Sequence, residues 1–173
     1  MCIFAICNFK TTKFEFTKQE FRNVDFNYNN KRSIIENLNF TLNKKISIGI
    51  SGDSGGGKTT FLNLILGLLR PSKGQIYVNN DNIDGTIEKL QNVISYVPQD
   101  IYLIDSDIKE NVSLEEEVNL TEDKINNIKV ALREAEFFSE EGIITDEFLS
   151  QKVGQKGINL SGGQVQRVGI ARA

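Results

Sequence analysis

Apolar and polar residues alternate in short segments through the first half of the chain. Each segment is rich in Ile, Val or Phe, and the asparagine-rich stretches between them are typical of turns. The segments lie at residues 21–28, 33–42, 44–51, 75–79 and 92–97. A period of two residues places successive side chains on opposite faces of a strand, so this pattern predicts β-strands.

A helical pattern interrupts these strands between residues 59 and 70. Its apolar residues cover most of the circumference of a helix, and Pro71, which cannot continue a helix, follows directly. The segment is therefore expected to form a buried helix. Because strands and a helix interleave along the chain, the order of the elements predicts an α/β fold.

Residues 113–141 form a second helical region with a different composition. They include nine acidic and three basic residues, so their net charge is −6, whereas the rest of the chain carries +3. Ser113 and Glu116 are spaced as a capping box at the start of this region. The apolar positions that recur at helical spacing are Ile125, Ile128, Leu132 and Ala135. We expect a separate helical part whose acidic side chains face solvent.

The composition excludes several kinds of enzyme. The 173 residues include no histidine, which rules out a Ser-His-Asp triad, a Cys-His pair and a zinc site built on histidine. Cys2 and Cys7 both lie at the start of the chain, so they form neither a four-ligand zinc site nor a disulfide framework, and they fit a reducing, cytosolic setting. The net charge of −3 argues against a broad basic surface for nucleic acid.

The apolar opening at residues 1–7 does not have the features of a targeting signal. It lacks a basic start and a cleavage site, and it is far shorter than the roughly 20 apolar residues that cross a bilayer. It is interpreted as a first strand or a frayed terminus. Since no other window is long and apolar enough, any membrane role is expected to come through a partner.

The most specific chemical signal is the segment GDSGGGKT. Gly52, Gly57, Lys58 and Thr59 occupy every fixed position of the phosphate-binding loop G-x-x-x-x-G-K-[ST], between a strand candidate and a helix candidate. Glycines let successive N–H groups turn inward around an anion, to which the helix N-terminus adds partial positive charge. The alternative is a glycine-rich turn that binds nothing. The residues expected to bind nucleotide are Gly52, Asp53, Ser54, Gly55, Gly56, Gly57, Lys58, Thr59 and Thr60.

The loop predicts ATP and Mg²⁺ as ligands. In this motif Lys58 reaches the β- and γ-phosphates, and the hydroxyl of Thr59 ligates Mg²⁺, which neutralises the same oxygens. A phosphate-binding loop occurs in proteins of many functions, so it names a superfamily only.

A second glycine motif, LSGGQ, follows at residues 160–164. Ser161 and Gln164 have the spacing of a capping box that opens a helix, which is the simpler interpretation. That interpretation does not explain Gly162 and Gly163, which expose backbone N–H groups at a helix start where an anion can approach. We therefore expect a second phosphate site, in which two copies face each other and the motif of each covers the ATP of the other.

Together, GDSGGGKT and LSGGQ resemble the nucleotide-binding domain of the ATP-binding cassette, or ABC, transporter family. The resemblance implies a P-loop NTPase with a RecA-like core, an N-terminal antiparallel β part and an α-helical subdomain at about residues 111–160. Residues 1–20 would be an extension or lead-in strand and residues 21–173 the ATP-binding domain. The partners implied are a second nucleotide-binding domain, arranged head to tail, and a transmembrane domain, so the chain would lie at the cytoplasmic face of the cell membrane.

The resemblance also assigns roles to residues outside the two motifs. Tyr28 matches the aromatic residue that stacks on adenine, with a core tyrosine at a strand end as the alternative. Gln99 matches the glutamine that contacts Mg²⁺ or the attacking water and senses the transmembrane partner. Residues 152–157 resemble the X-loop of exporters, although loops of Gly and Lys are common.

The sequence departs from the family pattern after the second motif. There the family places a strand that ends in Asp, then a catalytic Glu and a switch histidine, and the 173 residues contain none of these. Residues 101–105 end in Asp105 but precede the motif, so they are rejected as that strand. The expectation is an incomplete fold that binds ATP without hydrolysing it alone. The alternatives are an ABC-type ATPase that acts on DNA or ribosomes, and an inactive remnant.

Overall fold

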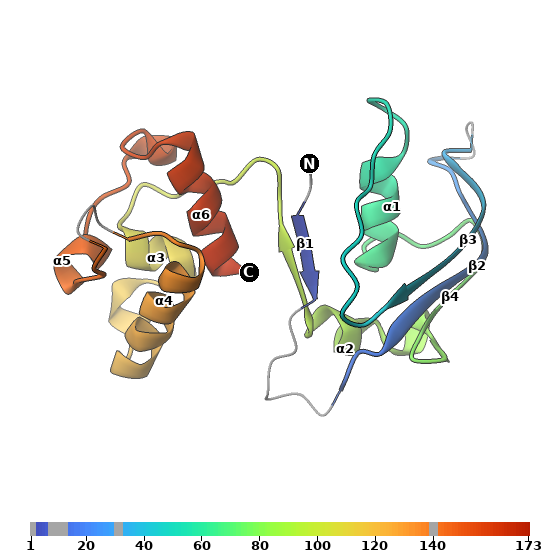
Figure 1. The fold of residues 1–173 in the computed structure, drawn as a ribbon, viewed down its shortest axis with the longest axis horizontal. Coiled ribbons are helices and arrows are strands. Elements are labelled where there is room, and N and C mark those ends of the chain that lie inside the picture. The colour runs from blue at the N-terminus through green and yellow to red at the C-terminus, as the bar shows by residue number, and fades with distance from the viewer. Residues whose placement is uncertain (1–2, 7–13, 30–32, 139–141) are drawn as a thin grey trace. The chain divides into compact units, whose positions relative to one another are not determined.

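The computed structural model describes residues 3–6, 14–29, 33–138 and 142–173. Contacts within the chain divide it into two compact units, one formed mainly by residues 6–95 and the other mainly by residues 96–173 (Figure 1). Cys2 and Cys7, which were predicted to form neither a zinc site nor a disulfide framework, lie outside the described residues.

The first unit contains a four-stranded antiparallel sheet in the order β3-β2-β4-β5, which confirms the antiparallel β part. Its central strand β2 pairs with β3 and β4, so that Phe21 lies opposite Phe40 on one side and Ile76 on the other. The strands are β2 (Lys18–Phe26), β3 (Ile35–Asn43), β4 (Lys73–Val78) and β5 (Asp81–Asn82).

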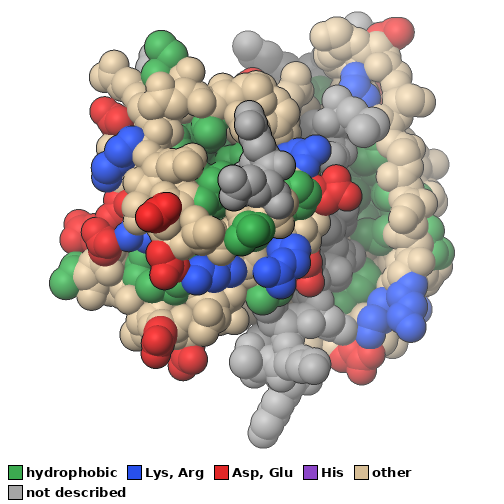
Figure 2. All heavy atoms as spheres, turned by 60° about the vertical axis from the view of Figure 1, so that its left-hand side comes forward, with side chains coloured by type: hydrophobic (Ala, Val, Ile, Leu, Met, Phe, Trp, Pro, Cys, Tyr) green, Lys and Arg blue, Asp and Glu red, His purple; other side chains and the backbone are tan. Residues whose placement is uncertain are grey.

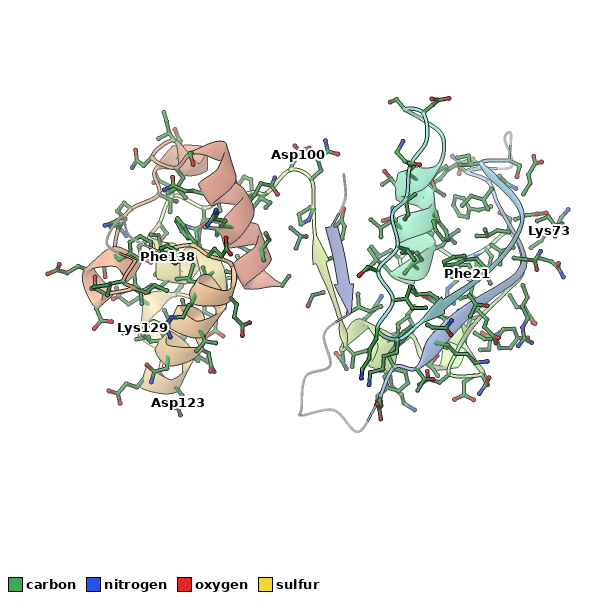
Figure 3. All side chains as sticks on the ribbon, in the orientation of Figure 1. Phe21, Lys73, Asp100, Asp123, Lys129 and Phe138 are labelled. Atoms are coloured by element: carbon green, nitrogen blue, oxygen red, sulfur yellow. The ribbon has the colours of Figure 1, made fainter. Side chains whose placement is uncertain are left out.

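Apolar side chains on one face of this sheet form the core of the first unit. Phe21, Val24 and Phe26 of β2 are all buried, and a register shift between Phe21 and Val24 interrupts the alternation of inward and outward positions. Phe61 of α1 (Lys58–Ile65) meets Phe21, which is labelled in Figure 3, edge-on with ring centroids 5.7 Å apart. The sheet and α1 therefore share an aromatic core, and the glycine loop leads directly into this packed helix.

The end of α1 differs from the expected helix over 59–70. Gly67, at φ +68°, donates its N–H to the carbonyl of Leu64, and Leu68 donates to Asn63. These two bonds are a Schellman motif, which ends a helix at a left-handed glycine. Gly67 therefore stops α1 well before Pro71. The short elements η1 (Ile83–Gly85) and α2 (Ile87–Gln91) follow β5.

The strand expected at residues 44–51 does not form. Residues 46–51 pair with no strand in the part of the chain that the structure describes, and Ile46, Ile48 and Ile50 are all exposed. Alternation shows that a segment suits a strand, but a strand also needs a neighbour that accepts its backbone hydrogen bonds. Elsewhere, β1 (Ile3–Ile6) and β6 (Ile94–Val97) pair in a two-stranded sheet. The opening segment therefore contains a strand, which was one of its two interpretations, and the strand predicted at residues 92–97 is confirmed.

The second unit is helical and packs around its own apolar core. The buried core includes Leu103, Ile108, Leu132, Phe148 and Val168. Figure 2 shows acidic side chains spread over the surface, as expected for a solvated acidic region. The elements are α3 (Ile108–Ser113), η2 (Glu117–Asn119), α4 (Glu122–Glu134), α5 (Asp146–Leu149), η3 (Gln155–Gly157) and α6 (Gly162–Arg172).

The capping box expected at Ser113 and Glu116 is absent. Ser113 is the last residue of α3, and the long acidic helix α4 begins later, at Thr121, whose hydroxyl accepts a hydrogen bond from the N–H of Lys124. Ser, Thr, Asp and Asn all cap helices well, so spacing alone did not distinguish Ser113 from Thr121. On α4, Ile128 and Leu132 are buried, as the helical spacing predicted.

Candidate functional site

The glycine loop joins residues 46–51 to the N-terminus of α1. Gly55 and Gly57 adopt left-handed φ angles of +80° and +82°, a region that residues with a Cβ rarely enter. Gly57 is the N-cap of α1, and no side chain caps the helix. The N–H groups of the first turn therefore remain available to an anion, as a phosphate site requires.

Lys58 folds back over this loop. Its ammonium group donates to the carbonyl of Gly52 at 2.8 Å and to that of Asp53 at 2.6 Å. Gly56 donates its N–H to the same Asp53 carbonyl at 3.1 Å, and a Cβ on Gly56 would lie 3.1 Å from this oxygen. The loop is thus a tight turn with a cation bound to two of its carbonyls, which suits the polyphosphate of a nucleotide.

Tyr28 lies within reach of the same helix. Its hydroxyl is 3.5 Å from the Oγ1 of Thr60, which is buried, and its ring packs edge-on against Phe26 with centroids 4.8 Å apart. Tyr28 nevertheless keeps 44% of its surface exposed. The structure therefore brings together the predicted aromatic residue and the phosphate loop, although they lie far apart in the sequence. Thr59, the predicted Mg²⁺ ligand, is exposed in the first turn of α1.

The second glycine motif lies at the start of α6. Ser161 accepts a hydrogen bond from the N–H of Gln164 at 3.2 Å, and the Gln164 side chain accepts one from the N–H of Ser161 at 2.7 Å. The capping box is therefore formed. Gly162 and Gly163 are exposed, and a Cβ on Gly162 would meet nothing within 4 Å. The box thus fixes the helix start and leaves the glycine N–H groups accessible.

Gln99 belongs to the same unit as α6. Its side chain is exposed, and its backbone carbonyl accepts a hydrogen bond from the Nε2 of Gln166 at 3.1 Å. Sequence reasoning did not single out Gln166. It stands two residues after the LSGGQ motif, but no local pattern indicates a bond to a residue 67 positions away.

The described residues contain no cluster of three or more His, Cys, Asp or Glu side chains that could hold a metal ion. The two residues predicted to bind Mg²⁺ carry neutral groups, a hydroxyl on Thr59 and an amide on Gln99. Neutral ligands leave the negative charge to the phosphate oxygens, so these residue types suit a metal that arrives with a nucleotide.

A left-handed glycine loop that leads into an uncapped helix, with a lysine over the loop, defines a phosphate-binding-loop protein. The family model described as ABC transporter matches residues 35–173. The chain therefore belongs to the ABC transporter family and has its P-loop NTPase fold.

Several similar proteins have names that refer to export or to drug resistance. A putative export ATP-binding/permease protein of Rickettsia felis is 36% identical over 155 residues, which cover 88% of this chain and 26% of that protein. A multidrug resistance ABC transporter ATP-binding and permease protein of Lactococcus lactis is 33% identical over 151 residues, covering 87% and 25%. The chain thus spans about a quarter of the length of these relatives.

A solved structure of a bacterial Atm1-family ABC exporter with ATP bound is also similar. Its TM-score is 0.77 at 26% sequence identity, and the match covers 97% of this chain and 30% of that one.

Among the residues that the structure describes here, no helix has the length and apolar character needed to cross a membrane.

Proposed function

We propose that this chain binds Mg²⁺-ATP in the loop of residues 52–60 and acts as the nucleotide-binding domain of an exporter-type ABC transporter. In that role, ATP binding and hydrolysis would drive transport across a membrane. The observation that carries the proposal is the Lys58 ammonium held over left-handed glycines at an uncapped helix start. The exporter relatives support the transport part of the proposal.

Each loop residue has a part in this proposal. Lys58 exchanges the carbonyls of Gly52 and Asp53 for phosphate oxygens, because a charge-assisted bond to phosphate is stronger than a bond to a neutral carbonyl. The N–H groups of the first turn of α1 donate to the same phosphates. Bound Mg²⁺ supplies positive charge that neutralises the phosphate oxygens, and the Thr59 hydroxyl and Gln99 amide are its proposed ligands.

Tyr28 and the LSGGQ motif complete the proposed nucleotide contacts. The exposed face of Tyr28 would stack on adenine, while its hydroxyl remains near Thr60. Ser161, Gly162, Gly163 and Gln164 would face the ATP of a second nucleotide-binding domain, with N–H groups at the start of α6 as donors. A transmembrane domain is the second partner, and it would hold the chain at the cytoplasmic face of the cell membrane.

Replacing Lys58 tests the nucleotide site. Lys58→Ala should weaken binding of a fluorescent ATP analogue by roughly 10-fold or more, because a hydrogen bond to a charged group contributes about 1.5–3 kcal/mol. Lys89→Ala is the matched control, since Lys89 is an exposed lysine of α2 in the same unit. Titration of the wild type and both variants, with circular dichroism to verify folding, measures the effect. Equal affinity of Lys58→Ala and wild type would contradict the proposed site.

A further inference from the structure

Three residues of α6 contact the chain segment that begins at Gln99. Gln166 donates its side-chain N–H to the carbonyl of Gln99 at 3.1 Å. Two turns further along, Arg172 donates through Nη1 to the carbonyl of Tyr102 at 2.6 Å. We name this contact the α6 seam, formed by Gln166, Gly169 and Arg172 on α6 and by residues 99–104.

Gly169 lies between the two donors and lets the segment approach the helix. It is buried, and a Cβ at this position would overlap the Cδ1 atom of Ile101 and lie 2.8 Å from its Cγ1. The side chain of Ile101 therefore packs directly on the backbone of α6. A glycine inside a helix is costly for helix formation, so its place here is explained by this close approach.

Arg172 also connects the seam to α3. Its Nε donates to the carbonyl of Asn111 at 2.5 Å, and its Nη2 lies 3.2 Å from the Oδ1 of Asn111, which is fully buried. The amide of Asn111 in turn accepts from the N–H of Ile104 and donates to its carbonyl, both at 3.0 Å. The far end of the segment is thus held by a planar fork of donors that lysine cannot reproduce.

The seam residues follow the same order along the chain as their partners. From Gln166 to Arg172 an α-helix rises about 9 Å, and the partners in order are Gln99, Ile101 and Tyr102. The positions 166, 169 and 172 recur at three-residue intervals, which keeps them on one side of the helix. The segment is therefore laid along α6 in a single register, while the side chain of Gln99 remains exposed.

We propose that Gln166 and Arg172 are positioning residues, which hold the main chain of residues 99–102 on α6 so that the Gln99 side chain is presented to Mg²⁺-ATP. This inference rests on the proposed function, in which Gln99 contacts Mg²⁺. It implies that Gln99 is held against the same helix, α6, that the LSGGQ motif begins. The hydrogen bond to the backbone carbonyl of Gln99 restricts the main chain at this residue, and it does not involve the side-chain amide, which is the proposed Mg²⁺ ligand.

The experiment compares nucleotide binding with Mg²⁺ and with EDTA, using a fluorescent ATP analogue and the full chain. Gln99→Ala should reduce the gain in affinity that Mg²⁺ produces, because one of the two proposed protein ligands is lost. Gln166→Glu, which keeps the shape but removes the N–H donor, should reduce that gain by roughly 3- to 10-fold and leave the affinity in EDTA unchanged. Gln166→Lys, which restores a donor, should recover most of the gain. Ile170→Ala, at an exposed position of α6, is the control.

The outcomes separate this inference from the proposed function. A full Mg²⁺ gain in Gln166→Glu, or an equal loss of affinity with Mg²⁺ and with EDTA, would overturn the positioning role. A Mg²⁺ gain that is the same in Gln99→Ala as in wild type would overturn it as well. In contrast, a wild type that binds no nucleotide, or binds as well after Lys58→Ala, would refute the proposed function. Gln166 is exposed, so its replacement is not expected to prevent folding.

Discussion

The glycines of the phosphate loop differ in why each position needs a residue without a side chain. Gly55 and Gly57 both adopt left-handed φ angles near +80°, yet a Cβ on Gly55 would lie in open space. A Cβ on Gly57 would lie 2.9 Å from the Cγ2 of Ile34, so packing and backbone conformation both require glycine there. Gly57 is also the N-cap of α1, which makes it the position least tolerant of a side chain.

We predict that Gly57→Ala lowers both stability and nucleotide affinity. The left-handed conformation costs a residue with a Cβ about 1–2 kcal/mol, and the contact with Ile34 adds to this. Gly85→Ala is the control, because Gly85 has open space around it and no left-handed φ. Urea unfolding at neutral pH measures the free energy of unfolding of each variant. Similar losses in the two variants would show that the loop conformation is not the cause.

Gln19 shows a residue whose role only the fold reveals. It takes an inward position in the alternation of β2, where it is fully buried and donates its Nε2 to the carbonyl of Ile65 at 3.1 Å. Its Oε1 has no partner among the described protein groups. From the sequence alone, a glutamine is not expected to be buried. In the fold, the Ile65 carbonyl in the last turn of α1, where carbonyls lack partners within the helix, accepts its hydrogen bond.

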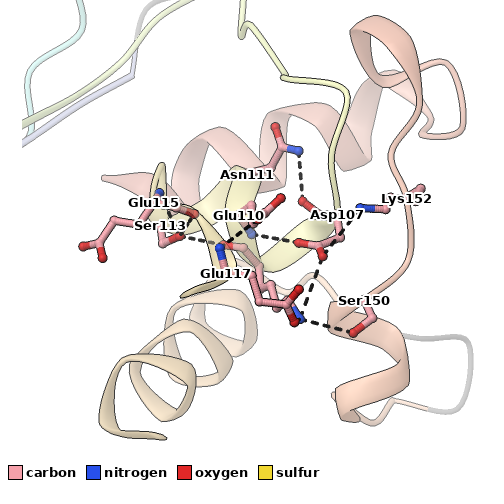
Figure 4. Close-up of polar contacts among 9 residues, drawn as sticks. Asp107, Glu110, Asn111, Ser113, Glu115, Glu117, Ser150 and Lys152 are labelled. Carbon is pink, nitrogen blue, oxygen red and sulfur yellow. Dashed lines mark hydrogen bonds and ion pairs between the residues drawn. The ribbon is translucent and has the colours of Figure 1, made fainter. Parts of the chain in front are cut away.

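At the scale of elements, a polar network holds the start of α3 (Figure 4). Asp107 caps α3 by accepting from the N–H of Glu110 at 3.0 Å, and Lys109 and Lys152 each approach its carboxylate at 3.9 Å. Lys109 also pairs with Glu117 of η2. Three separate segments of the second unit are thereby connected through two buried residues, Asp107 and Lys109.

This network makes stability depend on pH. The hydrogen bond from Lys109 lowers the pKa of Glu117, and the same bond raises the pKa of Lys109 despite the opposing effect of burial. The contribution of Glu117 is therefore complete above its unfolded pKa and is lost as pH falls through its lowered pKa. The contribution of Lys109 is complete below its unfolded pKa and is lost as pH rises through its raised pKa.

We predict that Lys109→Met reduces both of these pH-dependent losses of stability. Without the ammonium group, the Glu117 carboxyl returns toward its ordinary pKa, so the difference between its folded and unfolded pKa values shrinks. Urea unfolding between acidic and alkaline pH measures the dependence. Lys89→Met, on the exposed surface of α2, should keep the wild-type profile. A steeper acid loss in Lys109→Met than in wild type would refute this account.

The elements themselves were predicted unevenly. Strands β2, β3, β4 and β6 overlap the segments that alternation indicated, and α1 begins at the predicted motif. The end of α1 was wrong because Gly67 was not considered as a terminating residue, and residues 44–51 were wrong because pairing was assumed. One error concerns the residue that ends a helix, and the other concerns the neighbouring strand that a strand must pair with. Both are harder to recognise in a sequence than the spacing of apolar residues within an element.

At the scale of the molecule, the two glycine motifs lie in different units. The loop of residues 52–60 belongs to the unit formed mainly by residues 6–95, and the motif of residues 160–164 to the other. Under the proposed function each motif contacts a different ATP, one bound by its own chain and one bound by a second copy. Protection of the second motif by nucleotide should therefore depend on the concentration of protein.

Hydrogen exchange with Mg²⁺-ATP tests this arrangement. The amides of residues 52–60 should be protected by nucleotide at every protein concentration, whereas those of Gly162 and Gly163 should be protected only when the concentration favours a pair of copies. Lys58→Ala should remove both kinds of protection. Protection of Gly162 and Gly163 that does not change with concentration would contradict the second copy as their partner.

The sequence by itself determined the features that depend on neighbouring residues. The glycine loop with its left-handed turns, the Lys58 position and the capping box of Ser161 and Gln164 each involve residues only a few positions apart. Their geometry follows from steric limits and local hydrogen bonds, so a motif predicts it.

Only the tertiary structure decided which distant groups meet. The Tyr28 hydroxyl lies beside Thr60, Gln166 holds the carbonyl of Gln99, and Ile46 remains exposed although its segment suits a strand. Each of these depends on whether a partner from elsewhere in the chain is present at the right place. A local pattern shows which partners a residue can accept, whereas packing of the whole unit selects the one it has.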